Sequence, residues 1–265
     1  MPVITIGQYY PTGSPVHGLD PRLKLVCSFV YVIVLFLISS GWGYVAAAIF
    51  LFGCIKLARV PIRFVLRGLR AIFFLLSFTI VLNIFMFPGE ELLFSVGFVG
   101  VYREGVLMAV MLGTRLCLLV IGSALLTLTT PPIELTGAME YVMTPLKRLR
   151  VPTAEIAMMM TIALRFIPTL IEEMHKIMKA QKARGADFES GGLIKKARGL
   201  VPLLVPLFVS AFRRADELAM AMEARCYRPD APRTKMKIHK LGRTDFVAIG
   251  ASVAAFSVIL SFNWL

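Results

Sequence analysis

Long apolar stretches alternate with basic segments over the first half of the chain and return near its C-terminus. Each stretch is about 16 to 24 residues long, the length that a helix needs to cross a hydrocarbon layer about 30 Å thick. They lie at Leu23–Ser40, Gly43–Ala58, Leu69–Phe87, Gly105–Leu128 and Asp245–Trp264. Because the strands of a membrane β-barrel would show alternating segments of about ten residues, the pattern predicts five transmembrane helices.

The region between the fourth and fifth stretches has a different pattern, with apolar positions at helical spacing among many charged residues. It predicts three amphipathic helices: one after Thr130, with Pro131 in its first turn, to Leu149, one after Thr153 to Arg184, and one over Leu193–Arg225. At 1.5 Å per residue, the last two would each reach roughly 45–50 Å. Prolines inside them predict bends, at Pro168, Pro202 and Pro206.

Composition supports a membrane protein and excludes a soluble enzyme, since 57% of the 265 residues are hydrophobic and only 17% are charged. The net charge is +13, and 20 of the 29 basic residues lie between Thr129 and Thr244. Eleven acidic residues share that segment, so its net charge is 20 − 11 = +9. The fold expected is therefore an all-α integral membrane protein with transmembrane helices in residues 1–128, a cytoplasmic helical domain in 129–244 and a last transmembrane helix in 245–265.

The flanking charges orient the spans. Arg22 and Lys24 lie at the start of the first span, and five basic residues lie from the end of the second span to the start of the third, whereas the loop of residues 88–104 is weakly acidic. Positive charge favours the cytoplasmic side, so we expect the N-terminus inside and the C-terminus outside. Because the basic residues are interleaved with apolar ones and do not form a block with stacking aromatics, nucleic-acid binding is not expected.

Both long amphipathic helices end in an arginine between small residues, Ala183-Arg184-Gly185 in one and Ala224-Arg225-Cys226 in the other. Small neighbours would let a helix end enter a groove, where a guanidinium group binds carboxylate or carbonyl oxygens of another protein. The alternative is that each arginine only complements the negative end of its helix before a cap residue.

Several blocks resemble the transmembrane T subunit of energy-coupling-factor (ECF) vitamin and metal transporters, a kind of ABC transporter. They comprise His17-Gly18-Leu19-Asp20-Pro21-Arg22-Leu23-Lys24-Leu25, LTLTTPPIEL over residues 126–135, ALRFIPTLIEE over residues 163–173, and the two arginine triplets. Cys226 departs from the family pattern, in which the second triplet often ends in glycine.

The resemblance implies a transport complex in the cytoplasmic membrane of a prokaryotic cell. Its T subunit joins two ABC ATPases, alike or different, to one small S component that binds the vitamin or metal. Arg184 and Arg225 would each dock on one ATPase. ATP and Mg are expected on those partners, since the chain lacks a Walker A motif; it binds no cofactor and is not catalytic alone.

Other residues have two open interpretations. Arg115 in the fourth span anchors helices or contacts the S component, or else it packs against Asn83, backbone carbonyls or lipid; Asn83 itself suits contact between helices. Arg165 and Pro168 fit a structural helix bend. The adaptable side chains of Met158, Met159 and Met160 suit a platform for exchangeable S components, or the core between helices. No residue spacing predicts a metal site.

Two alternatives to the ECF assignment stay open. A conventional ABC importer permease also docks a cytoplasmic helix into its ATPase, but such permeases pair two subunits with one docking element each. The more distant alternative is an intramembrane enzyme, for which no catalytic motif is found.

Overall fold

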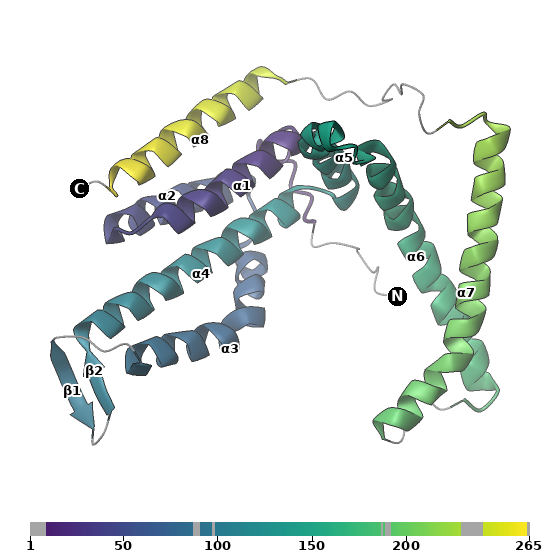
Figure 1. Ribbon diagram of the computed structural model, residues 1–265, viewed down its shortest axis with the longest axis horizontal. Coiled ribbons are helices and arrows are strands. Elements are labelled where there is room, and N and C mark those ends of the chain that lie inside the picture. The colour runs from purple at the N-terminus through teal and green to yellow at the C-terminus, as the bar shows by residue number, and fades with distance from the viewer. Residues whose placement is uncertain are drawn as a thin grey trace. The chain divides into compact units, whose positions relative to one another are not determined.

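The computed structural model describes residues 9–86, 91–96, 99–186, 188, 192–228 and 241–263. The ends that the sequence assigned to the third and fifth spans, Phe87 and Trp264, lie outside these residues. The described chain is helical apart from one short hairpin, which confirms the all-α membrane fold class (Figure 1). It divides into two compact units, residues 7–145 with 239–265, and residues 1–6 with 146–238. The division predicted at residues 128 and 244 stays a prediction.

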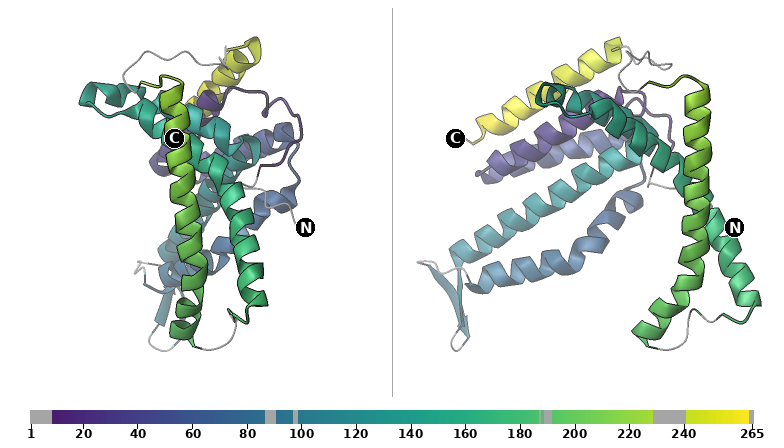
Figure 2. Two further views of the ribbon diagram at one scale, coloured as in Figure 1. Left: turned by 90° about the vertical axis from the view of Figure 1, so that its right-hand side faces the viewer. Right: turned by 45° about the vertical axis from the view of Figure 1, so that its right-hand side comes forward.

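The larger unit contains the helices of all five predicted spans. They are α1 (Pro21–Leu37), α2 (Gly41–Ala58), α3 (Ile62–Met86), α4 (Arg103–Thr129) and α8 (Arg243–Ser261). The short α5 (Pro132–Met143) packs against α1. α1 and α2 each pack against α4 and α8, while α3 packs along α4 (Figures 1 and 2). α1 begins directly after Asp20, whose carboxylate caps the helix by accepting the Arg22 backbone N–H at 2.9 Å.

Span lengths differ in detail from those predicted. Among the described residues, α2, α4, α6 (Thr153–Ala183) and α8 are long and apolar enough to cross a membrane, and α3 is a fifth if its two halves, bent by 60°, count together. α1 has 17 residues, the lower end of the usual range. α6 qualifies because only Glu155 and Arg165 are charged in its first nineteen residues, whereas the remainder is strongly charged.

A β-hairpin occupies part of the loop between α3 and α4. β1 (Leu92–Val96) pairs antiparallel with β2 (Val99–Tyr102), where the sequence predicted only a loop. Arg103 closes its base: its backbone N–H donates to the Glu91 carbonyl, and its side chain pairs with the Glu91 carboxylate at 2.8 Å.

Two apolar clusters form the core of this unit. Leu35, Ala47, Leu118 and Ile259 belong to the larger one, which joins α1, α2, α4 and α8. The smaller one consists of Ala58, Val60, Val65 and Leu128. It brings the end of α2, the start of α3 and the end of α4 together, at the end of the bundle where α1 also begins.

The smaller unit is built from two long helices, α6 and α7 (Leu193–Ala224), which pack side by side. Their bounds agree with those predicted within one residue. Pro168 lies inside α6, and Pro202 and Pro206 lie inside α7, which bends in the part near its start (Figure 1).

The first predicted amphipathic helix is shorter than expected. The sequence predicted one helix to Leu149, but α5 ends at Met143 and a 3₁₀-helix covers Thr144–Leu149. Pro145 explains the break, since its ring has no N–H to donate and clashes with the preceding turn. The first-turn proline is Pro132, and Pro131 is the N-cap residue.

Candidate functional site

The end of α6 is a tight left-handed turn. Arg184 is the C-cap residue, and Gly185 follows with φ of +85°. The Gly185 N–H donates to the Lys182 carbonyl at 3.0 Å, and the Ala186 N–H donates to the Gln181 carbonyl at 3.0 Å. These two bonds define a Schellman ending, which satisfies carbonyls that the helix leaves open.

The end of α7 repeats this geometry. Arg225 is the C-cap residue with φ −93° and ψ 13°, close to φ −87° and ψ 8° at Arg184. Cys226 follows with φ of +55°, and its N–H donates to the Glu223 carbonyl at 2.9 Å. The Tyr227 N–H completes the ending with a 3.0 Å bond to the Met222 carbonyl.

All six residues of the two triplets are exposed: Ala183, Arg184, Gly185, Ala224, Arg225 and Cys226. Gly185 ends α6 as the alternative interpretation expects, in which Arg184 only complements the negative end of the helix. At the second ending a cysteine adopts the same backbone conformation, although a residue with a Cβ atom is disfavoured there. The two endings therefore present their arginines alike, although a glycine follows one and a cysteine follows the other.

Arg115 is held by the end of α1. Its guanidinium donates to the Ile38 carbonyl at 2.8 Å and lies 5.6 Å from the centroid of the Tyr44 ring and 5.9 Å from that of Phe36. Its Nε is buried without a partner among the described residues. Asn83 is not its partner, because the Asn83 amide donates to the Thr79 carbonyl of the same helix at 2.9 Å.

The remaining sequence candidates lie on α6. Met159 is exposed, whereas Met158 and Met160 are half-buried. Arg165 and Pro168 are both exposed. These positions leave both the platform and the packing interpretations of the methionines open.

Sequence reasoning missed an apolar stripe on α7. Its members recur every four residues in two adjacent rows and are all exposed: Leu200, Leu204, Phe208 and Phe212 in one row, and Val201, Val205 and Val209 in the other. The same residues recur at helical spacing in the sequence, next to two prolines that predict a bend.

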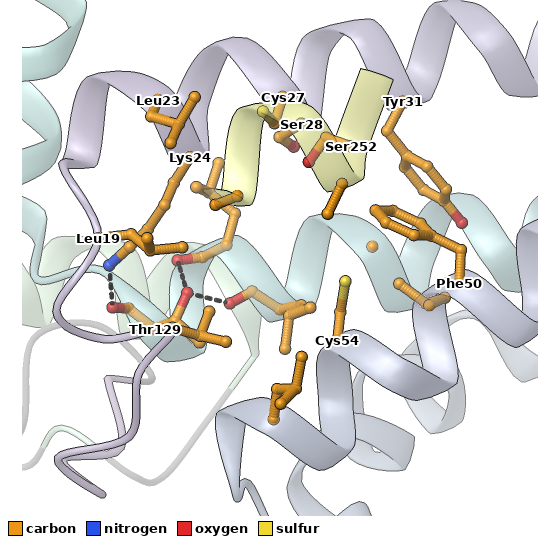
Figure 3. A pocket seen from close by; sticks show the side chains of 18 of the residues that line it. Leu19, Leu23, Lys24, Cys27, Ser28, Tyr31, Phe50, Cys54, Thr129 and Ser252 are labelled. Atoms are coloured by element: carbon orange, nitrogen blue, oxygen red, sulfur yellow. Dashed lines mark hydrogen bonds between the residues drawn. The ribbon is translucent and has the colours of Figure 1, made fainter. Parts of the chain in front are cut away.

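A polar cluster at one end of the membrane unit was also missed. The Lys24 ammonium, although buried, donates to the His17 carbonyl at 3.0 Å and to the Thr129 carbonyl at 3.1 Å (Figure 3). The buried Asp245 carboxylate accepts the Asp20 N–H at 3.0 Å and the Gly242 N–H at 2.8 Å. The cluster joins α1, α4 and α8, so it fixes how these helices begin and end.

Beside Lys24 lies a cavity of about 230 Å³ between α1, α2, α4 and α8. Figure 3 shows its mostly apolar lining, to which Tyr31, Phe50 and two thiols, Cys27 and Cys54, contribute. Within the described parts of the chain, no group of three His, Cys, Asp or Glu side chains is placed to hold a metal ion.

Comparisons with known proteins agree with this architecture. Residues 12–237 match the family model of CbiQ, described as cobalt transport protein. The energy-coupling factor transporter transmembrane protein EcfT of Clostridium kluyveri is 54% identical over 263 residues, covering 98% of this chain and 97% of the relative. EcfT of Ruminiclostridium cellulolyticum is 48% identical, covering 99% and 98%, and EcfT of Bacillus subtilis is 47% identical, covering 96% and 97%. The chain therefore belongs to the CbiQ/EcfT family of energy-coupling factor transporter transmembrane proteins.

Proposed function

We propose that this chain couples ATP hydrolysis by two ABC ATPase subunits to uptake of a vitamin or other micronutrient through an S component. The observation that carries this proposal is the matched pair of helix endings, each with an exposed arginine at the C-cap position and a left-handed residue after it. Two docking elements in one chain suit two ATPases.

The mechanical part of the proposal rests on the helices behind the arginines. α6 has 31 residues and α7 has 32, so each would span roughly 45–50 Å if straight. A guanidinium fork binds carboxylate or carbonyl oxygens with fixed geometry. Movement of an ATPase that holds Arg184 or Arg225 would then reach the far end of a helix, because packed helices move as rigid elements.

The S component would bind apolar surface on the same two helices. Met159 on α6 and the exposed stripe on α7 supply such surface. Methionine adapts to different partners, which fits S components that exchange on one platform.

The predicted orientation is retained as part of the proposal. The end of the membrane unit that holds Lys24 also carries the exposed Lys56, Arg59, Arg63 and Arg243. Positive charge favours the cytoplasmic side, which puts the N-terminus inside and the C-terminus outside.

ATP chemistry would belong to the partner subunits, which would bind ATP and Mg. This chain would act without a catalytic site or a cofactor of its own. The relatives are named as transporter transmembrane proteins, which supports a non-catalytic role.

The test is affinity purification of the tagged full-length chain from native membranes in mild detergent, with the bound chains identified and counted. We expect one copy of this chain with two ATPase chains and one S component per complex. Two copies of this chain would instead support a conventional ABC permease. Absence of any ATPase from complexes that retain the S component would contradict the coupling role.

A further inference from the structure

The segment that connects α2 to α3 has an unusual backbone. α2 ends with Arg59 in the left-handed conformation, at φ of +53°, where its N–H donates to the Lys56 carbonyl at 3.2 Å. Pro61 then precedes the start of α3. Arginine at a left-handed position costs about 1 kcal/mol or more relative to glycine, so an exposed cation is retained at a place where glycine would fit better.

The first nine residues of α3 form a distinct half of that helix, because the axis bends by 60° between Ile62–Arg70 and Ile72–Met86. One side of this half faces the protein. Val65 is 2% exposed in the small cluster at the end of α4, and a Cβ atom on Gly68 would lie 3.6 Å from Val120. The half-helix is therefore fixed against the bundle.

The outward surface of this half-helix has two adjacent strips. Arg63, Arg67 and Arg70 are spaced by four and three residues, so they share one strip, and all three are exposed. Ile62 and Leu66, 56% and 48% exposed, form an apolar strip between the arginines and the protein-facing side. A basic strip beside an exposed apolar strip is typical of helices that lie in the membrane interface.

The stretch of sequence that carries these cations is free of acidic residues. The sequence from Pro21 to Met86 contains no aspartate or glutamate. Asp20 and Asp245, at the same end of the unit, are buried and accept backbone N–H groups, so they are directed inward. Five exposed cations, Lys56, Arg59, Arg63, Arg67 and Arg70, thus lie together at the end of two transmembrane helices.

We propose that the start of α3 is a binding site for the headgroups of anionic phospholipids. Arg63, Arg67 and Arg70 would bind lipid phosphates, for which the guanidinium fork is well shaped, while Ile62 and Leu66 contact the upper acyl chains. Lys56 and Arg59 extend the positive surface on the α2 side. This inference does not depend on the proposed coupling function, because it concerns only the membrane unit.

The apolar strip favours lipid over an acidic protein partner. An acidic protein groove would neutralise the arginines but leave Ile62 and Leu66 against water or polar groups. A bilayer can contact both strips at once, because its phosphate layer binds the arginines and the adjacent hydrocarbon contacts Ile62 and Leu66.

The test reconstitutes the full-length chain in phosphatidylcholine vesicles with trace spin-labelled phosphatidylglycerol or spin-labelled phosphatidylcholine. The motionally restricted fraction of each label measures its association with the protein. We expect at least about a threefold preference for the anionic label at low salt, reduced in 0.5 M NaCl because salt screens exposed charges. The triple variant R63Q/R67Q/R70Q should lower this preference at least about twofold.

Two controls make the result specific. R63K/R67K/R70K keeps the positive charge and should retain most of the preference. K147Q/R148Q/R150Q removes the same charge from exposed residues elsewhere and should retain it as well. No preference in the natural protein, or an equal loss in this second control, would overturn the proposal. It would also be overturned if R63Q/R67Q/R70Q left the preference intact but weakened binding of a partner protein in neutral detergent, which would identify a protein contact instead.

Discussion

Gly185 and Cys226 occupy the same place in two copies of one helix ending. Each follows an exposed arginine, each has a left-handed backbone, with φ of +85° and +55°, and each donates its N–H to the carbonyl three residues earlier. A glycine has no Cβ atom to strain in this conformation, whereas a cysteine has one. The two endings therefore share one backbone shape, but only the ending at Cys226 is strained.

Substitutions at Cys226 and at Gly185 should have opposite effects on stability. C226G should stabilise the end of α7 by about 1 kcal/mol, and G185A should destabilise the end of α6 by a similar amount. The Tyr227 and Ala186 amides each donate to the carbonyl five residues earlier, so their hydrogen exchange measures each effect directly. Faster exchange at Tyr227 in C226G would show that the cysteine side chain stabilises the turn instead.

Charge reversal of the two arginines should uncouple the transporter. R184E or R225E places an acidic group at the contact surface and should weaken ATPase association and abolish uptake, because a like charge across an interface costs several kcal/mol. Co-purification and uptake in vesicles measure the two effects.

R213E provides the matched control, since Arg213 is an exposed arginine in the interior of α7. It should leave ATPase association intact. Uptake by the R184E/R225E double variant at the natural rate would contradict the assignment of both endings as docking elements.

Loss of the Lys24 charge should destabilise the membrane unit. K24M removes the donor for the His17 and Thr129 carbonyls, together with a buried positive charge that attracts Glu134, Asp20 and Asp245. We expect a loss of about 3 kcal/mol, seen as a lower unfolding temperature in detergent. R22M is the comparison, because Arg22 lies 4.7 Å from the Tyr141 ring and its loss should cost about 1 kcal/mol at most.

Local signals predicted most helix limits, as the bounds of α6 and α7 show. Contacts between residues far apart in the chain could not be predicted from the sequence. Nothing near Asp245 indicates that its carboxylate accepts the N–H of Asp20, 225 positions earlier. The third span was also predicted to begin at Leu69, whereas α3 begins at Ile62, because the arginines of its first turns lower the hydropathy there although their spacing is helical. The arginine triplets were found because each is contained in three consecutive residues.

Close packing at Gly122 predicts a sharp steric effect. A Cβ atom there would lie 2.4 Å from Cε1 of Tyr31, whose hydroxyl donates to the Leu118 carbonyl at 3.3 Å. G122A should therefore push Tyr31 aside and destabilise the unit by about 1–3 kcal/mol. G250A is the matched control in α8, since nothing lies within 4 Å of the added Cβ atom. Equal unfolding temperatures for the two variants would contradict this packing.

Glu173 connects the two long helices and predicts a pH-dependent interaction. Its carboxylate accepts hydrogen bonds from the Ser210 hydroxyl and from the Arg214 guanidinium, the latter at 3.0 Å. The Ser210 hydrogen bond, with Arg214 adding attraction, holds the pKa of Glu173 below its ordinary value of 4.5. Because the pKa is lowered in the folded state, this contribution is full above about pH 4.5 and is lost as the pH falls through the lowered value.

The Arg214 and Glu173 side chains are 39% and 23% exposed, so solvent screens their attraction. A double-mutant cycle of E173Q and R214Q, measured by chemical unfolding in detergent, should give a coupling energy of about 0.5 kcal/mol at pH 7. The coupling should decrease in high salt and vanish once Glu173 is protonated. A coupling that persisted unchanged in acid would mean that the carboxylate charge does not contribute, and that the packing of α6 on α7 alone holds the pair together.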